Sequence, residues 1–223
     1  MNDLFLTGRD RSNIIHLTAL NCDVHSDLLA PLQALREIAQ QAGHDLAIAS
    51  AYRGFDRQLL IWNAKARGER PVLSLEGKVL DLETLSDWEK VQAILTWSAL
   101  PGASRHHWGS DLDVFNPLCM PPDYQLQLTQ AEYLEGVQCN FNQWLSQLLD
   151  AGRSDFFRPY QRYTGGIAPE PWHISYRPLA DQCQAALTRD VLADALETAD
   201  LCLKSCVLNH LDEILERFVR IGI

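Results

Sequence analysis

The sequence predicts an α+β fold, in which a small, mainly antiparallel sheet is flanked by helices and followed by a C-terminal helical appendage. Two observations carry this prediction. Short apolar runs of strand type are separated by segments of helical pattern, and they fall at 46–50, 112–115, 156–157 and 172–176. From Pro178 onward the pattern changes to nearly continuous amphipathic helix. We therefore expect one domain over residues 1–178 and a helical extension over 179–223. The extension is expected to pack on the core, in preference to forming a dimer surface or a lid.

The helices of the first domain have recognisable boundaries. Ser26 is a typical N-cap and Gly43 a typical stop for the first helix, whose apolar residues recur at helical spacing. Ser86 and Glu89 form a capping box at the start of the third. The four helices are expected over about 26–41, 56–65, 86–100 and 142–151.

Composition excludes several classes of function. The chain has 19 basic and 29 acidic residues, and its net charge of -10 argues against a nucleic-acid partner. No apolar stretch reaches the roughly 18 residues of a membrane span. Charged residues interrupt the N-terminal segment before an apolar run of signal-peptide length can form, so we expect a soluble, cytoplasmic protein. The six cysteines lack disulfide-scaffold spacing. Cys202 and Cys206 lie one helical turn apart and could share a metal, but buried apolar positions are the favoured interpretation.

Residues suited to metal chemistry gather in two short segments, 104–113 and 170–173. A catalytic zinc ion takes three nitrogen, oxygen or sulfur ligands and leaves a fourth position for water. The candidate ligands are His106, Asp113 and His173. Two adjacent strands around the Gly109 turn could bring His106 and Asp113 together, and a third strand could supply His173. His107 is an alternative to His106, and on spacing alone the histidines could equally be packed core residues.

A carboxylate beside such a metal could move protons during hydrolysis, and Glu170 is placed for this role. Its odd separation from His173 would direct the two side chains to opposite faces of a regular strand. The prolines at 169 and 171 relieve this conflict, because they predict an irregular approach to the strand.

Three segments in this order resemble the zinc D-alanyl-D-alanine carboxypeptidases of the VanY type. They are Ser50-Ala-Tyr-Arg53 continuing to Gln58, Ser104-x-His106-x-x-Gly109-x-x-x-Asp113, and Glu170-Pro-Trp-His173-x-x-Tyr176. The resemblance spans roughly residues 28–178 and extends to LD-carboxypeptidases and to the hedgehog and lysostaphin-like zinc fold. The sequence departs from the pattern at Asp111, where the family commonly has alanine. Asp111 shares a strand face with Asp113, so it predicts an extra negative charge near the metal.

The resemblance implies a role for each matching residue. Glu170 would be the general base, and Arg53 would grip the terminal carboxylate of the substrate, which suits the planar guanidinium fork. Ser104 and Gln58 would donate or accept hydrogen bonds with the substrate. One zinc ion per chain would be held by His106, Asp113 and His173.

The implied substrate is a peptidoglycan stem peptide ending in D-alanine, cut at either a D,D or an L,D bond. A cytoplasmic enzyme that attacked pentapeptide precursors would compete with wall synthesis, so L,D cleavage of recycled tetrapeptides is the preferred expectation. A D,D-carboxypeptidase, a D-Ala-D-Ala dipeptidase or a peptidoglycan endopeptidase would use the same metal. A non-catalytic zinc module that binds peptides is an alternative from another class. The oligomeric state is left open.

Overall fold

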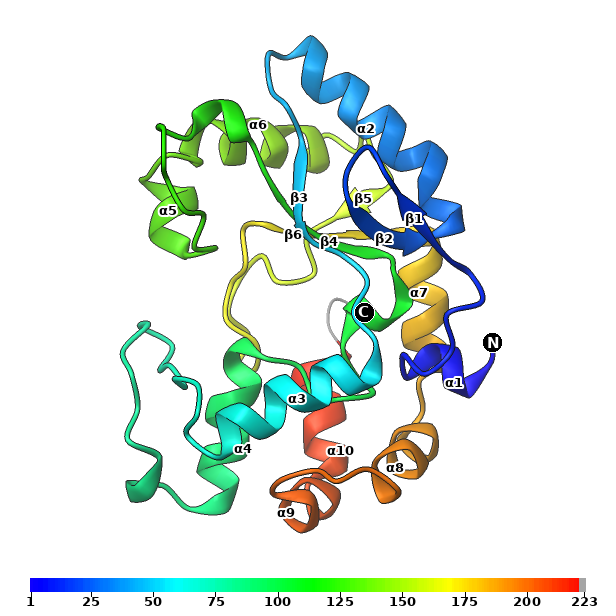
Figure 1. Ribbon diagram of the computed structural model, residues 1–223, viewed down its shortest axis with the longest axis vertical. Helices are drawn as coiled ribbons and strands as arrows, with labels where there is room; N and C mark the ends of the chain where they lie inside the picture. The colour runs from blue at the N-terminus through cyan, green and yellow to red at the C-terminus, as the bar shows by residue number, and fades with distance from the viewer. Residues whose placement is uncertain (221–223) are drawn as a thin grey trace.

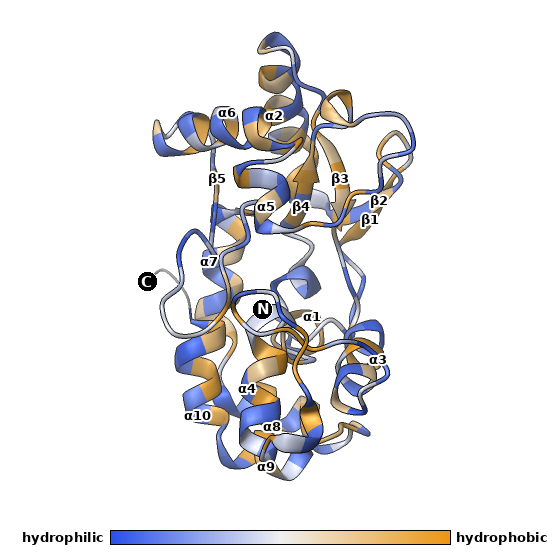
Figure 2. Ribbon diagram, turned by 90° about the vertical axis from the view of Figure 1, so that its left-hand side faces the viewer, coloured by the Kyte–Doolittle hydropathy of each residue, from blue (hydrophilic) through white to orange (hydrophobic). Residues whose placement is uncertain are grey.

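The computed structural model describes residues 1–220, and its elements gather into two groups above and below the centre of the molecule (Figure 1). The upper group holds both sheets with helices α2, α5 and α6, and the lower group holds α3, α4, α8, α9 and α10 (Figures 1 and 2). Helix α7 connects the two. The α-helices are α1 Asp3–Leu6, α2 Leu29–Gln41, α3 Phe55–Ala66, α4 Asp87–Trp97, α5 Gln130–Leu134, α6 Cys139–Asp150, α7 Arg177–Ala186, α8 Arg189–Glu197, α9 Lys204–Asn209 and α10 Leu211–Ile214. Short turns of other helix types are η1 Ser26–Leu28, η2 Leu82–Thr84, η3 Arg105–Trp108, η4 Pro117–Cys119 and η5 Leu215–Val219.

The central sheet has the strand order β3-β4-β6-β5, and every neighbouring pair in it is antiparallel. Its strands are β3 Ala47–Ser50, β4 Asp111–Phe115, β5 Phe156–Phe157 and β6 His173–Tyr176. The register aligns Asp113 with Ser50 on one side and with His173 on the other. The predicted α+β class with a small antiparallel sheet is therefore confirmed. A separate hairpin, β1 Ile14–Leu17 with β2 Cys22–His25, is not indicated by the sequence pattern.

Local signals place the helix starts close to the predicted positions. At Ser86 the capping box is present, with the Ser86 side chain and the Glu89 side chain each accepting from the other's backbone. The first helix begins differently from the prediction, because η1 precedes α2 and His25 is its cap. The His25 ring accepts from the Asp27 backbone at 3.2 Å, so Ser26 is the first residue of the turn and not the N-cap.

Apolar side chains from both groups of elements form one continuous core. In the central sheet, Leu112, Val114 and Ile174 are fully buried. Trp62 of α3 and Trp108 of η3 are also fully buried and belong to the same core. The site described below therefore rests on a packed interior, which holds side chains in fixed orientations.

The C-terminal helices pack against α3 and α4. Trp62 donates its indole N–H to the Cys202 carbonyl at 3.0 Å, and Asn63 exchanges hydrogen bonds with the backbones of Asp200 and Cys202. The ring of His210 stacks on Trp88 of α4, with centroids 4.1 Å apart. A separate domain over 1–178 stays a prediction. Within residues 1–220, none of the helices is both long and apolar enough to cross a membrane.

Candidate active site

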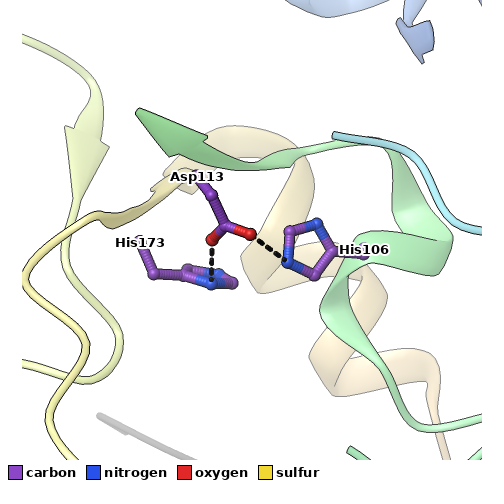
Figure 3. Close-up of side chains that lie close together, drawn as sticks. All are labelled: His106, Asp113 and His173. Atoms are coloured by element: carbon purple, nitrogen blue, oxygen red, sulfur yellow. Dashed lines mark ion pairs between the residues drawn. The ribbon is translucent and has the colours of Figure 1, made fainter. Parts of the chain in front are cut away.

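Three side chains from three elements converge beside the central sheet (Figure 3). His106 comes from η3, Asp113 from β4, and His173 is the first residue of β6. Nε2 of His106 lies 3.5 Å from Oδ2 of Asp113, and Nδ1 of His173 lies 3.2 Å from Oδ1 of Asp113. Within residues 1–220, this is the only group of three or more histidine, cysteine, aspartate or glutamate side chains that lie close enough to share a metal ion. Cys202 and Cys206 therefore do not belong to a group of this kind.

His106 reaches the site from a short helical turn, and the expectation that it lies on a strand is wrong. Gly109 explains the geometry, because it ends η3 in the left-handed region at φ +67° and reverses the chain into β4. A Cβ atom at this position would lie 2.6 Å from the backbone nitrogen of His25. Glycine is therefore required both for the turn and for the close approach of β2.

The hydrogen bonds decide between His106 and His107. Nδ1 of His106 donates to the carbonyl of Ala51 at 2.8 Å, which leaves Nε2 facing Asp113. His107 uses both ring nitrogens within the protein: Nδ1 donates to the Arg53 carbonyl at 2.5 Å, and Nε2 accepts from the Gly102 backbone at 3.0 Å. Burial lowers the pKa of His106 to about 4, so its ring is neutral and can offer a lone pair. His107 is a buried structural residue.

The polar groups around the three side chains fit a metal cation. Oδ1 of Asp113 and Nδ1 of His173 are buried and have no hydrogen-bond partner within residues 1–220. Such unpaired buried atoms are costly, and a bound cation would satisfy both. Ligands about 2.0–2.1 Å from a tetrahedral zinc lie about 3.3–3.5 Å apart, close to the two separations given above. Two imidazoles and one carboxylate match the zinc preference for nitrogen and oxygen donors.

The electrostatics also favour positive charge at this point. Burial alone would lower the pKa of His173, but its hydrogen bond to Asp111 and the nearby Asp113 and Glu170 carboxylates raise that pKa well above 6.5. Burial would raise the pKa of Asp113, yet the adjacent His106 and His173 hold it below its ordinary value. The site therefore stabilises positive charge beside Nδ1 of His173, and a dication bound there would replace the proton on that nitrogen.

Glu170 lies in the turn that precedes β6 and not within the strand. Its backbone N–H donates to the Tyr160 carbonyl at 2.9 Å, and its own carbonyl accepts from the His173 backbone at 3.1 Å. Oε2 of Glu170 lies 3.3 Å from Nδ1 of His173. The odd spacing of the two residues thus imposes no conflict, because strand alternation applies only from His173 onward. Burial raises the pKa of Glu170 above its ordinary value.

Arg53 is held in place by a chain of hydrogen bonds in the turn between β3 and α3. Nη1 donates to Oε1 of Gln58 at 2.9 Å, and Nη2 donates to Oγ of Ser50 at 3.1 Å. Gln58 is fully buried, and its Nε2 donates to the Ala99 carbonyl at 2.6 Å. Both ends of the Gln58 amide are therefore used inside the protein. Its contact with a substrate stays a prediction, and the structure gives it a role in positioning Arg53.

A cavity of about 240 Å³ joins these residues in one space. The predicted site residues that line it are Arg53, Ser104, His106, Asp113, Glu170 and His173. Its apolar wall contains Trp172 of the third motif segment and residues that the sequence does not indicate, among them Trp97, Leu128, Tyr160 and Ile167. The Tyr160 ring meets the His173 ring edge-on, with centroids 4.8 Å apart. A larger cavity of about 720 Å³ lies against α2 and the β1–β2 hairpin and contains none of the predicted site residues.

Residues 21–179 match the model of the VanY family, described as D-alanyl-D-alanine carboxypeptidase. The chain belongs to the VanY family. This confirms the resemblance drawn from the three sequence segments. An uncharacterized protein of Haemophilus influenzae is 45% identical over 98 residues, which are 43% of this chain and 67% of that protein.

Solved structures of VanY proteins and of an LD-carboxypeptidase share the fold. VanYB in complex with D-alanine-D-alanine is 22% identical, with a TM-score of 0.51 over 84% of this chain and 89% of its own. A mutant of the D,D-pentapeptidase VanY in complex with Zn(II) is 20% identical, with a TM-score of 0.50 over 86% and 87%. The LdcB LD-carboxypeptidase is 18% identical, with a TM-score of 0.52 over 88% and 82%. At these identities the likeness shows the fold of the family.

Proposed function

We propose that this VanY-family protein is a zinc-dependent carboxypeptidase that removes the C-terminal D-alanine from peptidoglycan stem peptides. The observation that carries the proposal is the shared cavity, where three potential metal ligands, a buried carboxylate and an arginine face the same space. The Zn(II) complex of a VanY structure and the D-alanine-D-alanine complex of VanYB support the choice of metal and of substrate class.

In the proposed hydrolysis, three residues bind the metal and Glu170 transfers the proton. A zinc ion held by His106, Asp113 and His173 would act as a Lewis acid toward the scissile carbonyl and the attacking water. Glu170 accepts the proton of that water and passes it to the leaving amine. Its raised pKa suits both steps, because a more basic carboxylate takes the proton more readily and still releases it near neutral pH.

Arg53 selects the end of the peptide. Gln58 and Ser50 each accept one hydrogen bond from its guanidinium group, so the remaining N–H groups are oriented before the substrate binds. A carboxylate can accept two parallel, charge-assisted hydrogen bonds from this fork. Only the last residue of a peptide carries a backbone carboxylate, so this contact makes the enzyme an exopeptidase.

For the bond that is cut, we propose L,D cleavage of recycled tetrapeptides in the cytoplasm. The conflict between cytoplasmic D,D cleavage of precursors and wall synthesis supports this choice, and the shared fold of the LdcB LD-carboxypeptidase is compatible with it. D,D cleavage of pentapeptides is the second candidate, since the family description and the VanYB complex both concern D-alanyl-D-alanine.

The deciding experiment incubates the zinc-loaded protein with a defined tetrapeptide and, separately, with the matching pentapeptide. Mass spectrometry of the products identifies what each has lost. Loss of one alanine from the tetrapeptide is the expected result, whereas loss from the pentapeptide alone would replace the L,D proposal with the D,D one. Release of a dipeptide would indicate a dipeptidase. The Glu170→Gln protein serves as the matched control, and a Glu170→Gln protein that retains full biological function would favour a peptide-binding module over an enzyme.

A further inference from the structure

A buried carboxylate that is not one of the three potential ligands contacts His173 from behind. Oδ1 of Asp111 lies 2.9 Å from Nε2 of His173, and the same oxygen accepts a hydrogen bond from Nε of Arg105 at 2.8 Å. Asp111 is 0% exposed and Arg105 3% exposed. Asp111 does not line the cavity, and the two lining residues that it contacts are His173 and Arg105.

The Asp111 carboxylate is fixed from several elements at once. Its second oxygen accepts from the hydroxyl groups of Ser110 at 2.5 Å and Ser175 at 3.0 Å. Arg105 in turn donates from Nη2 to Ser175 at 2.8 Å and from Nη1 to Gln184 at 2.9 Å. Arg105 belongs to η3 and Ser175 to β6, Ser110 lies between η3 and β4, and Gln184 of α7 supports Arg105, so the carboxylate is held toward His173 from several directions.

This arrangement determines which nitrogen of His173 faces the site. A neutral imidazole that donates its one N–H to a carboxylate has its lone pair on the other nitrogen, which is the state that binds a metal. Asp111 accepts at Nε2, so the lone pair is on Nδ1, the atom that lies 3.2 Å from Asp113. A ring flip would break the hydrogen bond with Asp111.

Arg105 limits what Asp111 can contribute through charge. The sequence predicts that Asp111 adds negative charge near the metal, but its oxygen is directly paired with the Arg105 guanidinium group. The charges of this pair offset each other at the site. The effect left to Asp111 is therefore the orientation of His173.

We propose that Asp111, held in place by Arg105, is a positioning residue that fixes the His173 ring for metal binding through Nδ1. The inference rests on the metal site of the proposed function. Outer partners of histidine ligands usually change metal affinity about 10- to 100-fold when they are removed. The Arg105–Gln184 contact also makes helix α7 part of the support of the metal site.

The test measures zinc affinity by competition with a chromophoric chelator and does not depend on peptide cleavage. Asp111→Ala is expected to weaken zinc binding about 10- to 100-fold. Asp111→Asn keeps an oxygen that can accept from Nε2, so its affinity should fall between those of the wild type and the alanine variant. The absorption spectrum of the cobalt-loaded alanine variant should also differ from that of the wild type, because the ligand geometry changes.

Loss of Asp111 leaves the buried Arg105 without its charged partner, which can prevent folding. The double variant Arg105→Met/Asp111→Ala removes both charges, and it should fold while still binding zinc about 10- to 100-fold more weakly. Asp23→Asn is the matched control, because Asp23 forms a similar pair with His16 and Arg11 away from the site. Its zinc affinity should equal that of the wild type.

A folded double variant with wild-type zinc affinity would overturn the inference. Nitrogen-15 NMR of the zinc-loaded wild type provides a check that needs no variant. It should show the His173 proton on Nε2, and a proton on Nδ1 would equally overturn the proposal. If the wild type binds no zinc, the proposed function fails instead, so the two failures are distinguishable.

Discussion

Removing the Arg53 side chain should abolish the preference for a free C-terminal carboxylate. The guanidinium group is partly buried and held by Gln58 and Ser50, so its interaction with a substrate carboxylate takes place away from bulk water. Truncating one partner of such a charged pair costs about 2–5 kcal/mol. At about 1.36 kcal/mol for each factor of ten, Arg53→Ala should lower kcat/KM about 30- to 5,000-fold.

The assay compares kcat/KM for one stem peptide with a free carboxylate and for the same peptide with a C-terminal amide. The wild type should strongly prefer the acid. Arg53→Ala should cleave both peptides at similar low rates, because the enzyme change and the substrate change remove the same interaction. Arg53→Lys keeps the charge but loses the planar fork, so an intermediate preference is expected. Arg57→Ala is the control, since Arg57 is exposed and does not line the cavity. An undiminished acid preference in Arg53→Ala would refute the role of Arg53 as the anchor.

Three further predictions follow from other parts of the structure. Glu170 must be ionised to accept a proton, and burial raises its pKa. The value of kcat/KM should therefore be lost as the pH falls, with a midpoint above 4.5. A midpoint at or below 4.5 would contradict this prediction. Gly109→Ala should destabilise the protein by about 2–6 kcal/mol in urea unfolding, through strain at φ +67° and the clash with His25; an unchanged midpoint would exclude both causes. Gly166→Ala should lower the free energy of unfolding by about 1–3 kcal/mol, because the added Cβ would lie 1.9 Å from the backbone oxygen of Arg217. A variant as stable as the wild type would show that the loop can move away freely.

The sequence indicates the features that depend on local pattern. The capping box at Ser86 and the short apolar strands follow from neighbouring residues, and the structure has them at or near the predicted positions. The three potential ligands are also brought together as predicted. Their motif segments reach the site through short-range turns, of which the Gly109 turn is the clearest.

Other features depend on contacts between distant parts of the chain. Nothing in the sequence distinguishes Arg105 from other charged residues. Its partners Ser175 and Gln184 lie 70 and 79 positions further along the chain, and only the fold brings them into contact with it. The β1–β2 hairpin has mostly half-buried or exposed residues and no regular apolar alternation, so its strands carry little signal. Gln58 fits a substrate-binding motif, yet its burial places both ends of its amide against the protein.

The most direct test of the central claim titrates zinc into chelator-treated protein while D-alanine release from the preferred stem peptide is followed. The rate is expected to rise in proportion to zinc and to level off at one equivalent per chain. His106→Ala, Asp113→Ala and His173→Ala should each remove this saturating response. A rate that is independent of added zinc, or that survives the loss of any one of these three side chains, would contradict the proposal of a zinc carboxypeptidase centre.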